Sequence, residues 1–266
     1  MRRSILTLTA LTLVLGACSS AEGSGGGGTT EPVEATELIV FAAASLADAF
    51  GEGIGPGFEE ANEGITVVFN FAASDSLAGQ IQSEGSADVF ASASGTWMDA
   101  VQDDPGVADR ADFVRNRLVI ITPPDNPAGV ASIGDLANEG VQLVLAAEGV
   151  PVGDYAREAL GNAGIAEEAE SNVVSNEEDN VAVVAKIVAG EGDAAIVYES
   201  DVSAAADNDV AAIEVPDDVN VIATYPIAVV SGAPNEGVAA EFVAYVLGTG
   251  WQAALEEYGF SPVGQT

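Results

Sequence analysis

Two short segments place a serine where an apolar run gives way to a helical pattern. In FAAASL at 41–46, a strand-like run passes through small residues to Ser45, and FAAS at 71–74 repeats the arrangement with Ser74. In open α/β sheets, ligands bind outside the carboxyl ends of strands, where hydroxyls and the free N–H groups of a following helix can hold an anion. Both serines are therefore candidate ligand residues. Helix capping is the alternative role, because serine is a common N-cap residue.

The acidic composition excludes several classes of protein. The 266 residues include 42 Asp and Glu against 7 Lys and Arg, a formal net charge of -35. Such a field repels DNA, RNA and anionic lipid surfaces, so no nucleic-acid partner is expected. Histidine is absent, which removes the commonest general base and transition-metal ligand. Hydrophobic residues make up 48% of the chain, enough to bury the core of one large or two modest domains.

The N-terminus has the pattern of a secretory signal. Arg2 and Arg3 precede an apolar run over 5–15, which is too short to span a bilayer. The run ends in LGAC at 15–18, which resembles the lipobox of bacterial lipoproteins, and Cys18 is the only cysteine. We therefore predict a signal peptide over 1–17, lipidation of Cys18 and an extracytoplasmic location, anchored to the cell membrane. A chance cysteine beside a signal peptide is the alternative.

A lipidated flexible tether is expected over residues 18–36. The segment is rich in Ser, Gly, Thr and Glu, contains the glycine run 25–28, and lacks an apolar period. As a flexible coil of about 18 residues it would span roughly 20–25 Å. Removal of the signal with its two arginines would change the charge from -35 to -37 and leave five cations: Arg110, Arg115, Arg117, Arg157 and Lys186.

From residue 37 onward, strand-like apolar runs alternate with helical periods, which predicts an α/β fold with largely parallel sheets. The predicted strands cover 38–42, 66–71, 88–92, 118–122, 142–146, 172–174, 194–198, 221–223 and 226–230. The predicted helices cover 76–82, 96–102, 154–163, 181–189, 236–247 and 251–258. Residues 46–61 are also helix-like, but their four glycines and one proline predict a broken helix.

Taken together, many segments resemble the periplasmic molybdate-binding proteins that supply ABC importers. The resemblance runs in order from 38 to 260 and rests on VFAAASL at 40–46, FAAS at 71–74, LAGQI at 77–81, ADVFASA at 87–93, WM at 97–98, VPVG at 150–153, YA at 155–156, DNV at 179–181, GDAAIVY at 192–198, SD at 200–201, YPIAVV at 225–230 and YGF at 258–260. Within it, Trp97 and Met98 are expected to pack a helix rather than to bind ligand.

The resemblance implies a two-lobed periplasmic binding protein fold of type II, with two crossing segments that join α/β lobes around a cleft. Mapped onto this chain, lobe one covers 37–118 and 226–266, and lobe two covers 119–225. The crossing segments would then be 118–122 and 224–230. Composition and periodicity alone do not indicate this division.

The resemblance also implies an oxyanion site. In that family serine hydroxyls, main-chain N–H groups and one tyrosine hydroxyl hold the anion, with no cofactor and no metal beyond the metal centre of the oxyanion itself. The corresponding residues here are Ser45, Ser74, Val152, Val181 and Tyr198, the two valines acting through their N–H groups. Outside the resemblance, a tyrosine that ends an apolar strand is usually a half-buried core residue. We expect Asp75 to cap the helix at 76–82 and to face solvent.

These features predict a monomeric, lipid-anchored binding protein that captures molybdate or tungstate and delivers it to the permease of an ABC importer. They predict no enzymatic activity, because no histidine could activate Ser45 or Ser74 as a nucleophile. Other solutes, such as sulfate, phosphate, a carboxylate or a metal chelate, are the main alternatives. A calcium site and a purely structural lipoprotein are further alternatives, although no EF-hand spacing occurs.

Overall fold

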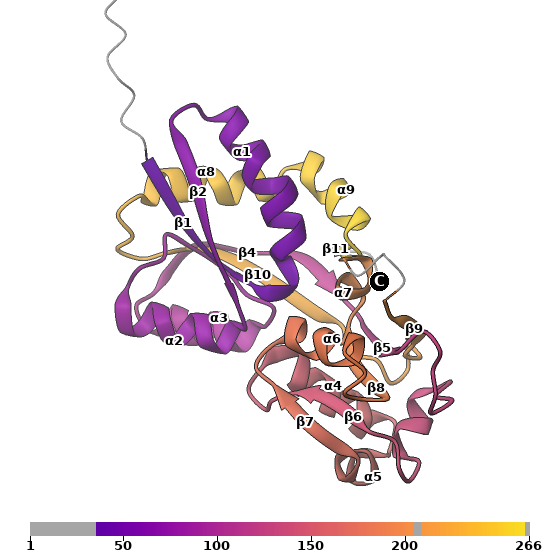
Figure 1. The fold of residues 1–266 in the computed structure, drawn as a ribbon. Helices are drawn as coiled ribbons and strands as arrows, with labels where there is room; N and C mark the ends of the chain where they lie inside the picture. The colour runs from indigo at the N-terminus through magenta and orange to yellow at the C-terminus, as the bar shows by residue number, and fades with distance from the viewer. Residues whose placement is uncertain (1–35, 205–208, 264–266) are drawn as a thin grey trace, which may run out of the picture. The chain divides into compact units, whose positions relative to one another are not determined.

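Two mixed β-sheets form the framework of the structure, a computed structural model that describes residues 36–204 and 209–263 (Figure 1). The larger sheet has the order β11-β4-β10-β3-β1-β2, with β1 Thr36–Ala43, β2 Ile65–Ala72, β3 Val89–Ala91, β4 Val107–Asn116, β10 Ala223–Val230 and β11 Ser261–Pro262. The smaller sheet has the order β7-β6-β8-β5-β9, with β5 Leu118–Thr122, β6 Leu143–Ala146, β7 Val173–Glu177, β8 Ala194–Tyr198 and β9 Ala211–Glu214. Mixed α/β architecture on two sheets agrees with the predicted fold class.

The predictions for the N-terminus fall almost entirely outside the described residues. The signal peptide at 1–17, Cys18 and the tether up to residue 35 belong to that part of the chain. Thr36 is described, and here the predicted end of the tether is wrong. Thr36 begins β1, and its N–H donates to the Gly64 carbonyl at 2.8 Å.

Each sheet combines a parallel part with an antiparallel part. β1 is parallel to β2 and β3, and β6 is parallel to β7 and β8. By contrast, β10 is antiparallel to β3 and β4, and β5 is antiparallel to β8 and β9. The expectation of largely parallel sheets is therefore wrong for the strands that cross between the sheets. Because β5 and β10 arrive from the other sheet and not through a helical crossover, their direction is not constrained to be parallel.

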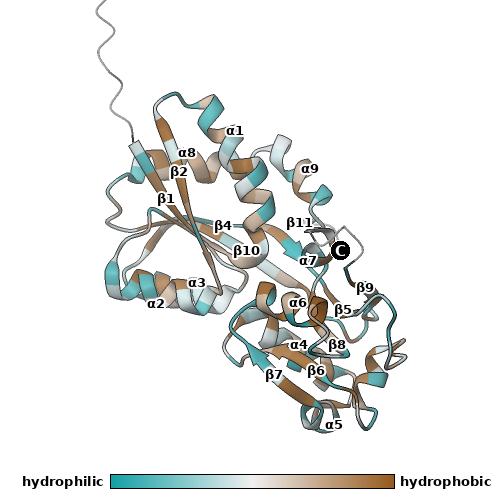
Figure 2. Cartoon of the chain, in the orientation of Figure 1, coloured by the Kyte–Doolittle hydropathy of each residue, from teal (hydrophilic) through white to brown (hydrophobic). Residues whose placement is uncertain are grey.

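Alternation along β1 gives the larger sheet two apolar faces. Phe41 packs into the core beneath α2 (Ser74–Glu84) and α3 (Gly95–Asp103), whereas Val40 belongs to the opposite core. Helices α1 (Gly55–Ala61) and α8 (Glu236–Val246) cover that opposite face, and α9 (Thr249–Glu257) lies against β4 and β11. The strands β1, β2 and β6 are among the most apolar segments (Figure 2). Around the smaller sheet lie α4 Pro151–Asn162, α5 Ala166–Ser171, α6 Asn180–Val188 and α7 Glu199–Ala204.

The broken helix predicted over 46–61 takes an irregular form. A 3₁₀ turn at Ala44–Leu46 is followed by a π-helical segment at Ala49–Ile54, which leads directly into α1. Gly55 stands at the junction, where an added Cβ would lie 2.5 Å from Cε2 of Phe69. The glycines therefore allow this helix to approach β2 closely, in addition to weakening its regularity.

Some elements differ from the sequence predictions. The strand expected at 221–223 is wrong, because only Ala223 is extended there, as the first residue of β10. The strands β4, β9 and β11 and the helices α5 and α7 were not predicted. β4 contains four charged side chains among its ten residues, so its apolar alternation is weak, and pairing with β10 and β11 stabilises it as a strand.

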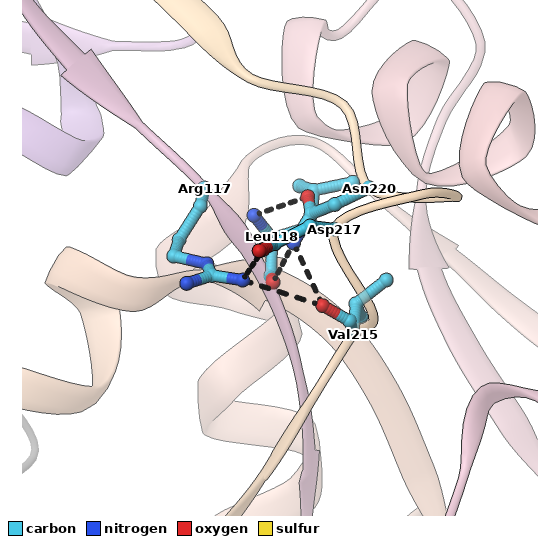
Figure 3. A network of polar contacts seen from close by, with 5 residues as sticks. All are labelled: Arg117, Leu118, Val215, Asp217 and Asn220. Carbon is cyan, nitrogen blue, oxygen red and sulfur yellow. Dashed lines mark hydrogen bonds and ion pairs between the residues drawn. The ribbon is translucent and has the colours of Figure 1, made fainter. Parts of the chain in front are cut away.

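Hydrogen bonds and an ion pair join the start of β5 to the segment between β9 and β10, so they link the two connections between the sheets (Figure 3). Asn220, in the segment that leads to β10, accepts a hydrogen bond from the Leu118 N–H at 3.0 Å and donates to the Leu118 carbonyl at 2.9 Å. It also donates to the Val215 carbonyl at 3.2 Å. Beside it, Arg117 pairs with Asp217 at 2.6 Å. Asn220 thus completes the hydrogen bonding of the first residue of β5.

We expect Asn220→Ala to lower the free energy of unfolding by about 2 kcal/mol, because it leaves backbone groups of Leu118 without partners. Asp217→Ala is the control, since it removes an ion pair whose carboxylate side chain is 89% exposed and should cost less than about 1 kcal/mol. Urea denaturation of both variants measures the difference. Equal losses of stability would contradict a special role for the amide.

Candidate functional site

The carboxyl ends of several strands meet at one small cavity, here called the central cavity. Its lining comes from the turn after β1 and the starts of α2, α4 and α6, together with the segment after β3 and the end of β8. The lining residues are Ala43, Ala44, Ser45, Ala73, Ser74, Ala93, Val150, Pro151, Val152, Asn180 and Tyr198. No charged side chain is among them. Four of the five predicted site residues are thus brought together, and Val181 is the exception.

Two hydrogen bonds link the segments on either side of the central cavity. The indole Nε1 of Trp97 on α3 donates to the Gly149 carbonyl at 2.8 Å, and the Tyr155 hydroxyl on α4 donates to the Ala93 carbonyl at 3.4 Å. Met98 is fully buried and packs α3, as predicted. Trp97 does more than pack a helix, because its ring N–H connects the larger sheet's helices to the loop before α4.

Ser74 is the first residue of α2 and is 1% exposed. Its Oγ accepts a hydrogen bond from the Ala93 N–H at 3.0 Å. Since that bond occupies a lone pair, the hydroxyl proton remains available to a group in the central cavity. The structure therefore presents Ser74 as a donor, and its side chain does not cap the helix, whose N-cap is Ala73.

Ser45 lies in the 3₁₀ turn that follows β1. Its Oγ is 2.9 Å from the hydroxyl oxygen of Tyr225, a fully buried residue of β10. Ser45 makes no side-chain cap of the turn, whose N-cap is Ala43. The sequence pattern that suggested a serine at a strand end did not indicate this second hydroxyl behind it.

The start of α4 supplies main-chain donors. Pro151 is the first helical residue and has no N–H, and the earliest intrahelical acceptor, the Val150 carbonyl, binds the Asp154 N–H at 3.0 Å. The N–H groups of Val152 and Gly153 therefore have no acceptor within the helix. A Cβ on Gly153 would lie 2.4 Å from the Ala147 carbonyl oxygen, so glycine permits the helix to begin this close to the end of β6.

Tyr198 ends β8 with its side chain only 2% exposed. Its hydroxyl oxygen is buried and has no hydrogen-bond partner within the described part of the chain. Burial raises the pKa of the hydroxyl well above its ordinary value, so it remains a neutral donor. A buried hydroxyl without a partner is costly, and a ligand in the central cavity would relieve that cost. This observation favours a ligand role over the alternative of a half-buried core residue.

Val181 does not line the central cavity, and its side chain is 55% exposed beside a larger neighbouring pocket. It is the second residue of α6, whose N-cap Asp179 accepts a hydrogen bond from the Ala182 N–H. Only the main chain of Val181 is thus available to the site. Asn180, which the sequence did not single out, lines the central cavity in its place.

Asp201 organises this part of the site, although sequence reasoning did not assign it. Its carboxylate accepts hydrogen bonds from the Tyr198 N–H at 2.9 Å and from Nδ2 of Asn180 at 2.7 Å. These bonds join the end of β8 to the start of α6. The pKa of Asp201 is raised to about 7, mainly because the carboxyl group is buried. The two hydrogen bonds lower this pKa by less than burial raises it, and the charges of Asp179 and Asp48 raise it further.

The expectation that Asp75 caps a helix and faces solvent is wrong. α2 begins at Ser74, so Asp75 is its second residue, and its Oδ1 is buried without a partner among the described residues. Burial raises the pKa of Asp75 more than the N–H groups of Ser76 and Asp75 itself lower it, and Asp154 raises it further. Asp75 does not line the central cavity.

Across 36–204 and 209–263, no group of three His, Cys, Asp or Glu side chains is arranged to hold a metal ion. In the same residues no helix has both the length and the apolar character needed to cross a membrane. What the central cavity offers chemically is a set of neutral hydrogen-bond donors.

Comparison with known proteins gives a family and a fold. Residues 38–261 match the family described as bacterial extracellular solute-binding protein. The molybdate-binding protein ModA of Mycobacterium tuberculosis is 35% identical over 228 residues, which cover 85% of each chain. The periplasmic molybdate-binding protein of Azotobacter vinelandii has a TM-score of 0.73 at 18% identity, covering 84% of this chain and 98% of that one. The sulfate-binding protein SubI of Mycobacterium tuberculosis has a TM-score of 0.73 at 17% identity, covering 86% and 88%.

The pKa of Asp201 predicts how stability depends on pH. Because its folded value of about 7 exceeds the ordinary 3.8, the folded protein retains a proton that the unfolded chain releases. The free energy of unfolding should therefore fall as pH rises from about 4 to 7, by up to about 1.4 kcal/mol per unit from this group. Asp201→Asn should remove this part of the slope, whereas Glu241→Gln, an exposed control on α8, should not. Identical slopes in parent and Asp201→Asn, from denaturant titrations at each pH, would contradict the assignment.

Proposed function

The chain belongs to the bacterial extracellular solute-binding proteins, and we propose that it captures molybdate or tungstate outside the cytoplasm and delivers it to the permease of an ABC importer. The observation that carries the proposal is an uncharged central cavity lined by the buried hydroxyls of Ser74 and Tyr198 together with Ser45. Similarity to ModA supports molybdate as the ligand. The proposed donors are Ser45, Ser74, Val152, Val181 and Tyr198.

Neutral donors can hold a dianion without a cation. A hydrogen bond to a charged group contributes about 1.5–3 kcal/mol net, so several donors that converge on one anion can offset its dehydration. The N–H groups at the starts of α4 and α6 add the favourable dipole of a helix N-terminus. The only metal in such a complex would be the central atom of the oxyanion, and no cofactor is required.

The same donors favour some oxyanions over others. Molybdate and tungstate near pH 7 carry no proton and need donors only. Phosphate at that pH usually carries a proton, which would meet another donor and lack an acceptor. Sulfate differs from molybdate mainly in size, so the dimensions of the bound cavity must distinguish these two anions.

The N-terminus supports attachment to a membrane. We propose that Cys18 is lipidated after removal of residues 1–17 and that the tether to residue 35 holds the binding domain at the cell surface as a monomer. The support for this is the LGAC motif at 15–18 and the glycine-rich composition after it. The attachment would place the captured anion close to the importer.

Calorimetry with molybdate, tungstate, sulfate and phosphate tests the ligand and the site together. We expect Ser45→Ala, Ser74→Ala and Tyr198→Phe each to weaken molybdate binding by about 1.5–3 kcal/mol, roughly tenfold to a hundredfold in Kd. Ser83→Ala is the matched control, since this serine is exposed on the same helix as Ser74 and donates to the Gly79 carbonyl. Parent-like affinity in both serine variants would reject the site, and preference of the parent for sulfate or phosphate would reject the ligand.

Lipidation is tested on the full chain expressed in a bacterium that processes lipoproteins. We expect the parent to sediment with membranes and to carry a mass increase of an acylated cysteine, because Cys18 is its only thiol. Cys18→Ala should appear in the soluble extracytoplasmic fraction while it keeps its affinity for molybdate. Membrane association that survives in Cys18→Ala would refute the anchor.

A further inference from the structure

A second group of buried polar side chains lies behind Ser45, outside the central cavity. Asn116 is the last residue of β4 and Tyr225 belongs to β10, so both stand on the strands that lead across between the sheets. The Tyr225 hydroxyl is 2.9 Å from Oγ of Ser45 and 3.3 Å from Nδ2 of Asn116. Nδ2 of Asn116 also donates to Oγ of Ser200 at 2.8 Å. Tyr225 and Asn116 are 0% and 1% exposed.

The chemistry of these groups gives the hydrogen bonds a direction. An amide nitrogen can only donate, so the Tyr225 oxygen accepts from Asn116. Tyr225 then has one proton left, and Oγ of Ser45, at 2.9 Å, is the oxygen placed to accept it. Burial raises the pKa of Tyr225, so the phenol keeps that proton. Ser45 therefore accepts from Tyr225, and its own proton is left for the central cavity.

Ser74 shows the same arrangement with a main-chain donor. Its Oγ accepts from the Ala93 N–H, which leaves its proton for the central cavity as well. A main-chain N–H keeps its direction whatever the ligand. A hydroxyl such as Ser45 could turn its own proton away from the ligand and accept one instead, unless a donor behind it blocks that direction and leaves the serine proton pointing into the central cavity. Ser45 thus needs a fixed donor that Ser74 already has.

We propose that Tyr225 and Asn116 are positioning residues that hold Ser45 as a hydrogen-bond donor, and that this direction makes the site reject oxyanions that carry a proton. The proposal rests on the proposed function of oxyanion capture. It adds a specificity determinant outside the five ligand residues, in a chain of donors from Asn116 through Tyr225 to Ser45. The ligand class that gains from it is the fully deprotonated tetrahedral oxyanion.

The ring of Tyr225 and its hydroxyl have separable roles. The ring makes edge contacts with Phe113, Tyr198 and Phe260 at centroid distances of 6.5, 5.9 and 5.7 Å. Tyr225→Phe keeps these contacts and removes only the hydroxyl. Without that donor, Ser45 is free to turn and to accept a proton from the anion. The variant therefore tests direction without removing the packing of the crossing strand.

The measurement is the ratio of the Kd for phosphate to the Kd for molybdate, by calorimetry at pH 7 on the full chain. We expect Tyr225→Phe to weaken molybdate binding about tenfold and to leave phosphate binding equal or tighter, so that the ratio falls by about tenfold or more. Asn116→Leu should lower the ratio in the same direction, which keeps the test decisive if one variant folds poorly. Tyr245→Phe, a half-buried tyrosine on α8, is the control for loss of a hydroxyl elsewhere.

Ser200→Ala is the second control. It removes the other acceptor of the Asn116 amide and leaves the amide beside Tyr225, so the ratio should not fall. An unchanged ratio in Tyr225→Phe would overturn the proposal. If both anions were bound more weakly, it would show a structural role only, and if both affinities stayed like those of the parent, it would show that Tyr225 does not direct Ser45. A parent protein that binds none of the oxyanions would instead overturn the proposed function, and the donor chain with it.

Discussion

A cavity that takes up an anion without a cation must present hydrogen-bond donors and no free acceptors. Much of the local structure around the central cavity serves this constraint. The Ala93 N–H occupies a lone pair of Ser74, and Tyr225 stands in the corresponding position behind Ser45. Helices α4 and α6 begin at the cavity, where their first N–H groups lack intrahelical acceptors. Gly153 allows α4 to start against the end of β6, because any Cβ would collide with the Ala147 carbonyl.

Acidic side chains near such a cavity are tolerated because main-chain or amide donors hold them. Asp201 accepts hydrogen bonds from the Tyr198 N–H and from Asn180, and so serves to align the donors of β8 and α6. Its pKa of about 7 means that it need not carry a full charge when a dianion is bound nearby. Burial also raises the pKa of Asp75 above its ordinary value.

The sequence predicts those parts of the site that depend on local chain direction. A serine at the end of a strand and before a helix is visible as FAAAS or FAAS, and both serines line the central cavity. The partners of these serines were not predictable, because they depend on pairing between strands far apart in sequence. Tyr225 reaches Ser45 only because β10 pairs with β3 and β4, in a register that sets Ala223 opposite Asn116. Asp201 was missed for a similar reason, since its partner Asn180 stands 21 residues earlier, at the start of a different helix.

The fold alone does not determine the anion. This chain matches the structures of a molybdate-binding and of a sulfate-binding protein with the same TM-score, 0.73. The choice of anion among proteins of this fold must therefore depend on side chains and cavity dimensions. On the proposed function, two independent properties would act on two different competitors. The dimensions of the cavity would separate sulfate from molybdate, because both are fully deprotonated dianions. The direction of the hydroxyls would separate phosphate, because its proton requires an acceptor. A backbone donor behind Ser74 and a tyrosine donor behind Ser45 would set this direction at both serines, and the packing of the small residues around them would set the dimensions.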